Sequence, residues 1–171
     1  WDKKKRTLTL IRDRMGEKPL YYGWQGEGIN KVFLFGSELK ALKPHPMFRG
    51  EINRNAISLQ LRHNYIPDPY SIYKDIHKLL PGHYLELKEN DLKKGLLPKI
   101  TNYWSLTKCA IHGNKNLLEF NGLEIQNDLE NLLKLSVKQQ MVSDVPTGAF
   151  LSGGIDSSTI VSMMQSQSNK P

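Results

Sequence analysis

The sequence contains very little cysteine: Cys109 is the single thiol in 171 residues. One cysteine cannot close an internal disulfide, and it leaves no second thiol for a cysteine-based metal cluster. This excludes a disulfide scaffold and is typical of a protein from a reducing compartment. We expect Cys109 to contribute to packing.

Long apolar runs are absent as well. No stretch approaches the roughly 18 to 20 apolar residues that a membrane-spanning helix requires, and no charged segment followed by an apolar one opens the sequence. The 5 histidines show none of the spacings of a zinc site. We therefore expect no membrane partner, no zinc and a cytoplasmic location.

The net charge of +7 would suit a nucleic acid, but the basic side chains are spread along the chain. The one dense cluster, residues 3–6, lies just before an alternating strand pattern and is typical of a solvated hairpin turn. Charge alone describes a field and not a site. No nucleic-acid partner is predicted.

The first hundred residues carry mostly β-type patterns. Four segments alternate in polarity or are rich in aromatic and β-branched residues between turn residues: 7–12, 19–24, 31–35 and 83–87. We expect the first three to form one antiparallel meander. In the fourth, Leu85 and Leu87 should share a face. Arg12 and Asp13, at the end of the first strand, are either functional or an ion pair that fixes a turn.

Two short helices are predicted between these strands. Residues 37–42 suit one helical turn that prolines stop, and residues 53–63 place Ile57 and Leu61 on one helical face. Residues 65–73 contain two prolines and should be extended or turning.

The composition and hydrophobic pattern of the sequence change after residue 105. Residues 106–122 are polar and without a strong period, which predicts a surface connection. We place a first domain at 1–107, a linker at 108–120 and the start of a second domain at 121–171. Asn121 and Glu124 form a weak capping box for a helix whose apolar residues recur at helical spacing up to Val137.

A strand, a glycine turn and a helix follow in that order. The apolar run 148–151 predicts a buried parallel strand, and residues 156–167 predict a helix. Gly153 and Gly154 between them allow backbone N–H groups to converge on an anion. The first turn of the helix adds unpaired N–H groups and the positive end of its dipole.

Polar side chains of the same turn favour a pyrophosphate. The hydroxyls of Ser152, Ser157 and Ser158 can donate further hydrogen bonds to it. Asp156 would repel an anion unless a cation lay between them, which predicts a Mg²⁺ contact. The alternative is that Asp156 only caps the helix. The common Gly-x-x-x-x-Gly-Lys-Ser/Thr loop is absent.

The complete string of residues 152–158, Ser-Gly-Gly-Ile-Asp-Ser-Ser, resembles the PP-loop of ATP pyrophosphatases. The preceding Asp-Val-Pro-Thr-Gly-Ala-Phe-Leu, 144–151, is similar to the asparagine synthetase version of that loop. Three upstream stretches resemble the glutaminase domain of the same family: 12–22, 36–42 and 79–85. The resemblance covers nearly the whole chain.

The resemblance implies a fold that is α/β and α+β. An Ntn-type, class II glutamine amidotransferase remnant, rich in β-structure, would be followed by the start of a parallel adenine-nucleotide α-hydrolase-like domain. The implied reaction is the ATP-dependent amidation of aspartate through a β-aspartyl-AMP intermediate, with glutamine as nitrogen donor and AMP and pyrophosphate as products. ATP and Mg²⁺ are the implied cofactors, the partners are small molecules, and a homodimer is allowed.

The resemblance also assigns residues. Those expected to bind ATP and its pyrophosphate are Phe150, Leu151, Ser152, Gly153, Gly154, Asp156, Ser157 and Ser158. Phe150 and Leu151 would lie near the adenosine, and Asp156 would contact the metal. The family's nucleophilic amino-terminal cysteine and its glutamine-holding residues have no counterpart in this sequence, and Cys109 occurs too late to serve. No catalytic residue is assigned, and the 171-residue chain by itself is expected to be inactive.

Two alternatives remain open at this stage. A related amidotransferase acting on a sugar or a natural-product acceptor would share the loop, because the acceptor-binding residues are not among those present. A non-catalytic binding or assembly module could have kept the fold. The acceptor therefore rests on resemblance alone.

Overall fold

The computed structural model describes residues 1–118 and 122–168. The chain divides into two compact units, Trp1–Asn116 and Leu117–Pro171. This division falls within the range predicted as a linker. The domain assignments on either side of it stay predictions.

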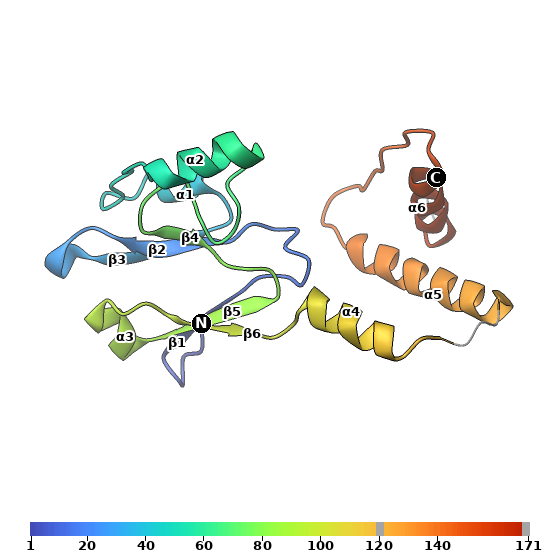
Figure 1. Cartoon of the computed structure of the whole chain (residues 1–171), viewed down its shortest axis with the longest axis horizontal. Helices are drawn as coiled ribbons and strands as arrows, with labels where there is room; N and C mark the ends of the chain where they lie inside the picture. Colours follow the sequence, from blue (N-terminus) through green and yellow to red (C-terminus); the bar gives the residue numbers. More distant parts are fainter. Residues whose placement is uncertain (119–121, 169–171) are drawn as a thin grey trace. The chain divides into compact units, whose positions relative to one another are not determined.

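The first unit is mixed α/β and is built on two small antiparallel sheets (Figure 1). The first sheet has the order β1-β5-β6 and contains β1 (Thr7–Ile11), β5 (His83–Lys88) and β6 (Lys99–Asn102). The second has the order β3-β2-β4 and contains β3 (Val32–Gly36), β2 (Tyr21–Gln25) and β4 (Ile76–Lys78). The four predicted strands are confirmed, and β4 and β6 were not predicted.

The predicted meander is wrong. β1 pairs with β5, with Leu8 opposite Leu87 and Leu10 opposite Leu85, whereas β2 pairs with β3 and β4. The alternation within a strand specifies which face is buried, but it does not specify the neighbouring strand. That choice is made here by packing between segments that are far apart in the sequence.

One apolar core joins the two sheets. Leu10, Leu85 and Leu87 from the first sheet cluster with Tyr22 of the second and with Leu79, which follows β4. Leu79, Leu85 and Leu87 have no exposed surface. Each such leucine contributes about 1.5 to 3 kcal/mol by burial. The prediction that Leu85 and Leu87 share a face is confirmed.

Short helices cover the connections of this unit. They are α1 (Leu39–Leu42), α2 (Arg54–His63) and α3 (Glu89–Lys94), with the 3₁₀ turn η1 (Gly28–Asn30). The first two were predicted. Ile57 and Leu61 share one face of α2 as predicted, but this face is not covered: Leu61 is 79% exposed and Ile57 is 40% exposed, whereas Ala56 is buried. Helical spacing identifies residues that share a face but not the element that covers it.

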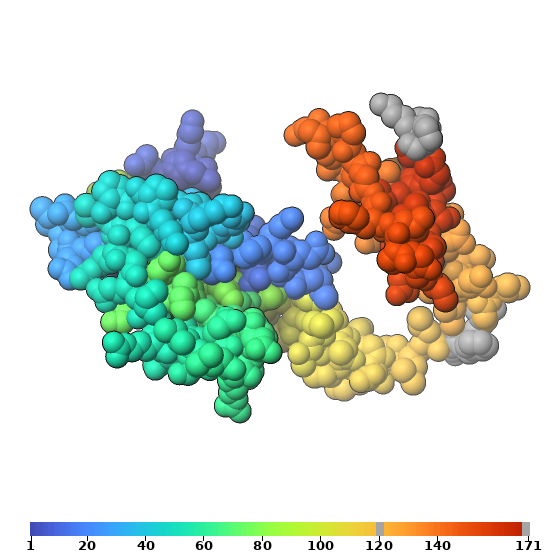
Figure 2. All heavy atoms as spheres, turned by 90° about the horizontal axis from the view of Figure 1, so that it is seen from above, coloured from blue at the N-terminus to red at the C-terminus, as the bar shows by residue number. Residues whose placement is uncertain are grey.

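A fourth helix, α4 (Leu106–Lys115), occupies most of the predicted surface connection. Ser105 caps it by accepting a hydrogen bond from the Lys108 N–H group. None of its residues is buried, and its atoms lie on the surface in Figure 2, in yellow. Cys109 lies on this helix and is exposed. The expected packing role of Cys109 is therefore wrong.

The second unit contains two helices, α5 (Gly122–Gln140) and α6 (Ile155–Ser166), and both confirm predictions (Figure 1). Val137 of α5 and Met163 of α6 are buried. The Gln167 side-chain amide also donates to the Lys134 carbonyl at 3.1 Å. Asn121 of the predicted capping box lies outside the described residues.

The predicted strand at 148–151 is contradicted. These residues are extended or irregular and exposed, and Phe150 is fully exposed. A strand needs a neighbour for its backbone hydrogen bonds, and no strand occurs among the described residues of the second unit. No helix in the described parts of the chain is both long enough and apolar enough to cross a membrane.

Candidate functional site

The predicted phosphate loop lies at the amino-terminal end of α6. Gly154 is the residue that precedes the helix, with extended φ and ψ angles of −80° and 161°. Gly153 has a φ of +81°, in the left-handed region that favours glycine. A Cβ atom at Gly153 would meet no atom within 4 Å. The backbone conformation, and not crowding, therefore calls for glycine, and the space above the turn is open.

Three serine hydroxyls gather around this turn. The Oγ atoms of Ser152 and Ser157 are 2.9 Å apart, and Ser157 donates to the Gly154 carbonyl at 3.1 Å. Ser158 donates to the same carbonyl at 2.8 Å. The structure thus brings Ser152, Ser157 and Ser158 together around the glycines, as a phosphate loop requires.

The backbone of the turn is suited to an anion. The N–H group of Ser158 makes the helical hydrogen bond to the Gly154 carbonyl, at 3.1 Å. The N–H groups before it belong to the first turn, where an α-helix provides no acceptor. The positive end of the helix dipole adds to their field. Asp156 lies in the same first turn and is exposed, so its carboxylate is free to meet a cation.

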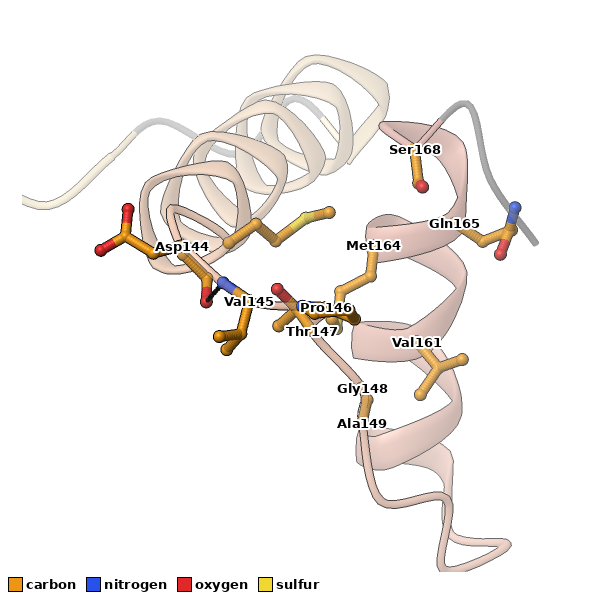
Figure 3. A pocket seen from close by; sticks show the side chains of 12 residues that line it. Asp144, Val145, Pro146, Thr147, Gly148, Ala149, Val161, Met164, Gln165 and Ser168 are labelled. Carbon is orange, nitrogen blue, oxygen red and sulfur yellow. Dashed lines mark hydrogen bonds between the residues drawn. The ribbon is translucent and has the colours of Figure 1, made fainter.

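Phe150 and Leu151 have no pocket in this structure. Phe150 is fully exposed and Leu151 is 63% exposed. A cavity of about 590 Å³ does lie nearby, between residues 141–149 and α6, but neither side chain lines it. Figure 3 shows Val161 and Met164 of α6 facing the segment 144–149 across this space. Phe150 and Leu151, which were expected near the adenosine, thus lie next to the loop in the sequence, and their side chains are exposed.

Arg12 does not pair with Asp13, so the predicted ion pair is wrong. The Arg12 guanidinium contacts the Asp68 carboxylate at 2.7 Å and donates to the Leu79 carbonyl at 2.6 Å. It also donates to the carbonyls of Lys18 and Gly16. Its side chain is 9% exposed. Arg12 therefore fastens the turn after β1 to two distant segments.

Asp13 stabilises the same turn through the backbone. Its carboxylate accepts hydrogen bonds from the N–H groups of Glu17 at 2.8 Å and Lys18 at 3.2 Å. Burial raises the pKa of the Asp13 carboxyl, but these hydrogen bonds lower it more, so that the pKa lies below its ordinary value. The turn is fixed by Asp13 as predicted, though without Arg12 as its partner.

Sequence reasoning missed the two partners that form a charge cluster with Arg12, which are Asp68 and Lys78. Lys78 of β4 approaches the other oxygen of Asp68 at 3.4 Å and donates to the Ile66 carbonyl. Arg12 precedes Asp68 by 56 residues and Lys78 follows it by 10, so the three residues form no recognisable sequence motif. A signal was present only in the two prolines that flank Asp68, which indicate a fixed turn. Among the described residues no group of three or more His, Cys, Asp or Glu side chains could hold a metal.

Comparison with known proteins decides the family. Residues 1–104 match the model of the glutamine amidotransferase domain. The chain belongs to this glutamine amidotransferase family. Residues 128–171 match a second family model, asparagine synthase. The amidotransferase match covers the whole of both sheets, and the synthase match covers the candidate loop.

Relatives of this amidotransferase chain carry both regions. A Methanocaldococcus jannaschii protein with the provisional name asparagine synthetase (glutamine-hydrolyzing) 2 is 40% identical, over 96% of this chain and 30% of the relative. Asparagine synthetase (glutamine-hydrolyzing) 3 of Bacillus subtilis is 33% identical, over 95% of this chain and 24% of the relative. Amidase chyE of Penicillium rubens is 29% identical, over 96% and 22%. The chain thus spans between a fifth and a third of the length of these relatives.

Proposed function

We propose that this chain is part of a glutamine-hydrolysing asparagine synthetase. The proposed reaction consumes ATP, aspartate, glutamine and water and yields asparagine, glutamate, AMP and pyrophosphate. One observation carries the proposal: an amidotransferase match and an asparagine synthase match follow one another in a single chain. The glycine turn before α6, with its serine hydroxyls, lies within the second match and supports the proposal. Small molecules are the proposed substrates, and a cytoplasmic location is proposed with them.

The residues of the loop fit the pyrophosphate part of ATP. The space around Gly153 is open, and the first-turn N–H groups of α6 supply donors. We assign Ser152, Ser157 and Ser158 to the same anion. Their hydroxyls bond to one another and to the Gly154 carbonyl, and these bonds would be exchanged for bonds to phosphate oxygens.

Asp156 fits a contact to Mg²⁺ that accompanies the nucleotide. Its carboxylate is exposed in the first turn of α6, and carboxylate oxygens are preferred Mg²⁺ ligands. One carboxylate is a typical protein contribution to a nucleotide-bound Mg²⁺, which keeps several waters. When bound, the metal neutralises charge that develops on the pyrophosphate. Phe150 and Leu151 are assigned to the adenosine by their place next to the loop.

The test uses the full-length protein that contains this chain, supplied with Mg²⁺-ATP, aspartate and glutamine. Equal amounts of AMP, pyrophosphate and asparagine are expected. The variant Asp156→Asn should lose activity by more than about 100-fold, the equivalent of several kcal/mol of metal-supplied stabilisation. Ser162→Ala, on an exposed part of the same helix, is the matched control and should keep activity.

The acceptor is tested separately. The relative named amidase chyE favours a second candidate, an amidotransferase with another acceptor. AMP formation that does not depend on aspartate would support this second candidate and contradict the synthetase. Absence of AMP formation under all conditions would contradict both.

A further inference from the structure

A pocket in the first unit is lined in part by Lys78, which belongs to the partly buried cluster of Arg12, Asp68 and Lys78. It has a volume of about 280 Å³ and lies between β2, β4 and α2. Its polar lining includes Tyr21, Gln60, Asn64 and Lys78, and its apolar lining includes Leu39, Ile66 and Ile72. None of the residues that line this pocket belongs to the proposed ATP loop.

The charge of the cluster that Lys78 connects to this pocket is unbalanced. Asp68 is shared by two cations, Arg12 at 2.7 Å and Lys78 at 3.4 Å. Within the described parts of the chain neither cation has a second carboxylate partner. The Arg12 and Lys78 side chains are 9% and 16% exposed, so water screens them weakly. The cluster therefore holds one excess positive charge, which an anion in the pocket would balance.

The hydrogen-bond donors point to the same kind of ligand. Lys78 bonds to the Ile66 carbonyl and to Asp68, and an ammonium group has a third donor. Among the residues described here, the Tyr21 hydroxyl and the side-chain amides of Gln60 and Asn64 make no hydrogen bond within the chain. Burial, and after it the charge of Asp68, raises the pKa of Tyr21, so its hydroxyl is a neutral donor at physiological pH.

We propose that this pocket binds a small carboxylate with a short carbon chain. A single excess positive charge matches a carboxylate monoanion better than a phosphate dianion, which would leave a net negative charge in a half-buried site. The carboxylate contacts Lys78 and the Tyr21 hydroxyl. Leu39 and Ile72 cover the carbon chain. Gln60 and Asn64 at the rim accept a neutral polar end of the ligand, since amides both donate and accept.

The test is an NMR titration of the isotope-labelled 171-residue chain with propionate, compared with propionamide at constant ionic strength. Propionamide has the same shape and no charge. Propionate should cause saturable chemical-shift changes at Tyr21, Gln60 and Lys78. Propionamide should bind at least about tenfold more weakly, as expected when one charged hydrogen bond is lost. Equal binding of the two, or no saturation by about 100 mM, where even a weak millimolar site would fill, would overturn the proposal.

Two variants locate the site. Lys78→Met removes the charge and should weaken propionate binding by at least about tenfold. Lys74→Met is the matched control, because Lys74 is 57% exposed, pairs with Glu51 and lies outside the pocket. Gln60→Ala changes an exposed residue of α2 and leaves the core intact. Its ligand in the test is lactate, which carries a polar hydroxyl. The variant should bind lactate about twofold more weakly or worse. Unchanged affinity in both Lys78→Met and Gln60→Ala would place propionate and lactate elsewhere and refute the site. Equal competition by chloride would refute the preference for carboxylates.

Discussion

The Arg12 side chain joins several separate segments of the first unit by hydrogen bonds. Its guanidinium bonds to the Asp68 carboxylate and to the carbonyls of Gly16, Lys18 and Leu79. These partners come from different parts of the chain, and the arginine is almost fully buried. Removing it leaves several polar groups without a donor in a place that water reaches poorly.

The variant Arg12→Met should therefore lower the free energy of unfolding by about 3 to 5 kcal/mol, the usual cost of breaking a buried ion pair from one side. Urea unfolding followed by circular dichroism measures it. Arg6→Met is the control, because the Arg6 and Glu89 side chains are 59% and 39% exposed and such pairs contribute about 1 kcal/mol or less. Similar losses in the two variants would contradict the assigned role of Arg12.

Glu51 provides a prediction about pH. A hydrogen bond from Lys74, and the charges of Lys74 and Arg49, lower the pKa of the Glu51 carboxyl below its ordinary value of 4.5. A carboxyl with a lowered pKa stabilises the fold above the pKa of the unfolded chain, and it loses this effect as the pH falls through the folded pKa. The effect should therefore vanish at acidic pH, below 4.5.

Carboxyl ¹³C NMR over an acid titration measures the Glu51 pKa directly. Lys74→Met should move the midpoint upward toward the ordinary value, and added salt should do so in the unmodified chain, because the pair is exposed. A Glu51 midpoint that did not respond to Lys74→Met would show that the contact is absent in solution.

At the scale of elements, α2 shows how local chemistry fixes a helix end. The Asn53 side-chain oxygen accepts hydrogen bonds from the N–H groups of Asn55 at 3.1 Å and Ala56 at 3.4 Å. The helix ends at Asn64, whose φ of 63° is left-handed. Both signals are local, which is why the sequence predicted this helix within a residue of its bounds.

Asn53→Ala should cost about 1 kcal/mol of stability, the typical value of an amino-terminal cap. Thermal unfolding measures this loss, with Asn55→Ala as the control, since the Asn55 side chain does not cap the helix. Hydrogen exchange of the first-turn amides should become faster in Asn53→Ala alone. Equal stability of the two variants would show that the cap does not contribute.

Strand neighbours illustrate the opposite case. The strands at 7–12 and 83–87 were predicted individually, but their pairing was not. Thr9 and its partner Glu86 are 77 positions apart in the chain, and the hydrophobic pattern of each strand fits several neighbours. The run 148–151 was predicted as a strand because it is apolar, and it remains exposed where no described strand lies beside it. The hydrophobic pattern indicates that a segment can form a strand, and a neighbouring strand is needed for it to do so.

At the scale of the molecule, the two units differ in how much apolar surface they bury. The first has a core of leucine and aromatic residues shared by two sheets. In the described part of the second, Val137 and Met163 are the buried residues, while Leu129, Leu132 and Phe150 are exposed. The first unit should therefore be much the more stable of the two.

Native-state hydrogen exchange of the 171-residue chain tests this difference. Amides of β1, β2 and β5 should exchange only through global unfolding, whereas amides of α5 and α6 should exchange through local opening at much lower free energy. In the full-length protein, α5 and α6 should become protected if other segments cover them. Equal protection of both units in the 171-residue chain would contradict the contrast in burial.

The sequence by itself determined the family resemblance, most of the strands and helices, and the Ser-Gly-Gly-Ile-Asp-Ser-Ser turn at the start of α6. These depend on neighbouring residues, whose backbone preferences and spacing can be seen in the chain. Only the tertiary structure decided the pairing of β1 with β5 and the cluster of Arg12, Asp68 and Lys78. Those contacts join segments far apart in the chain, and they form because burial of apolar and charged groups is settled by the whole fold and not by any one segment.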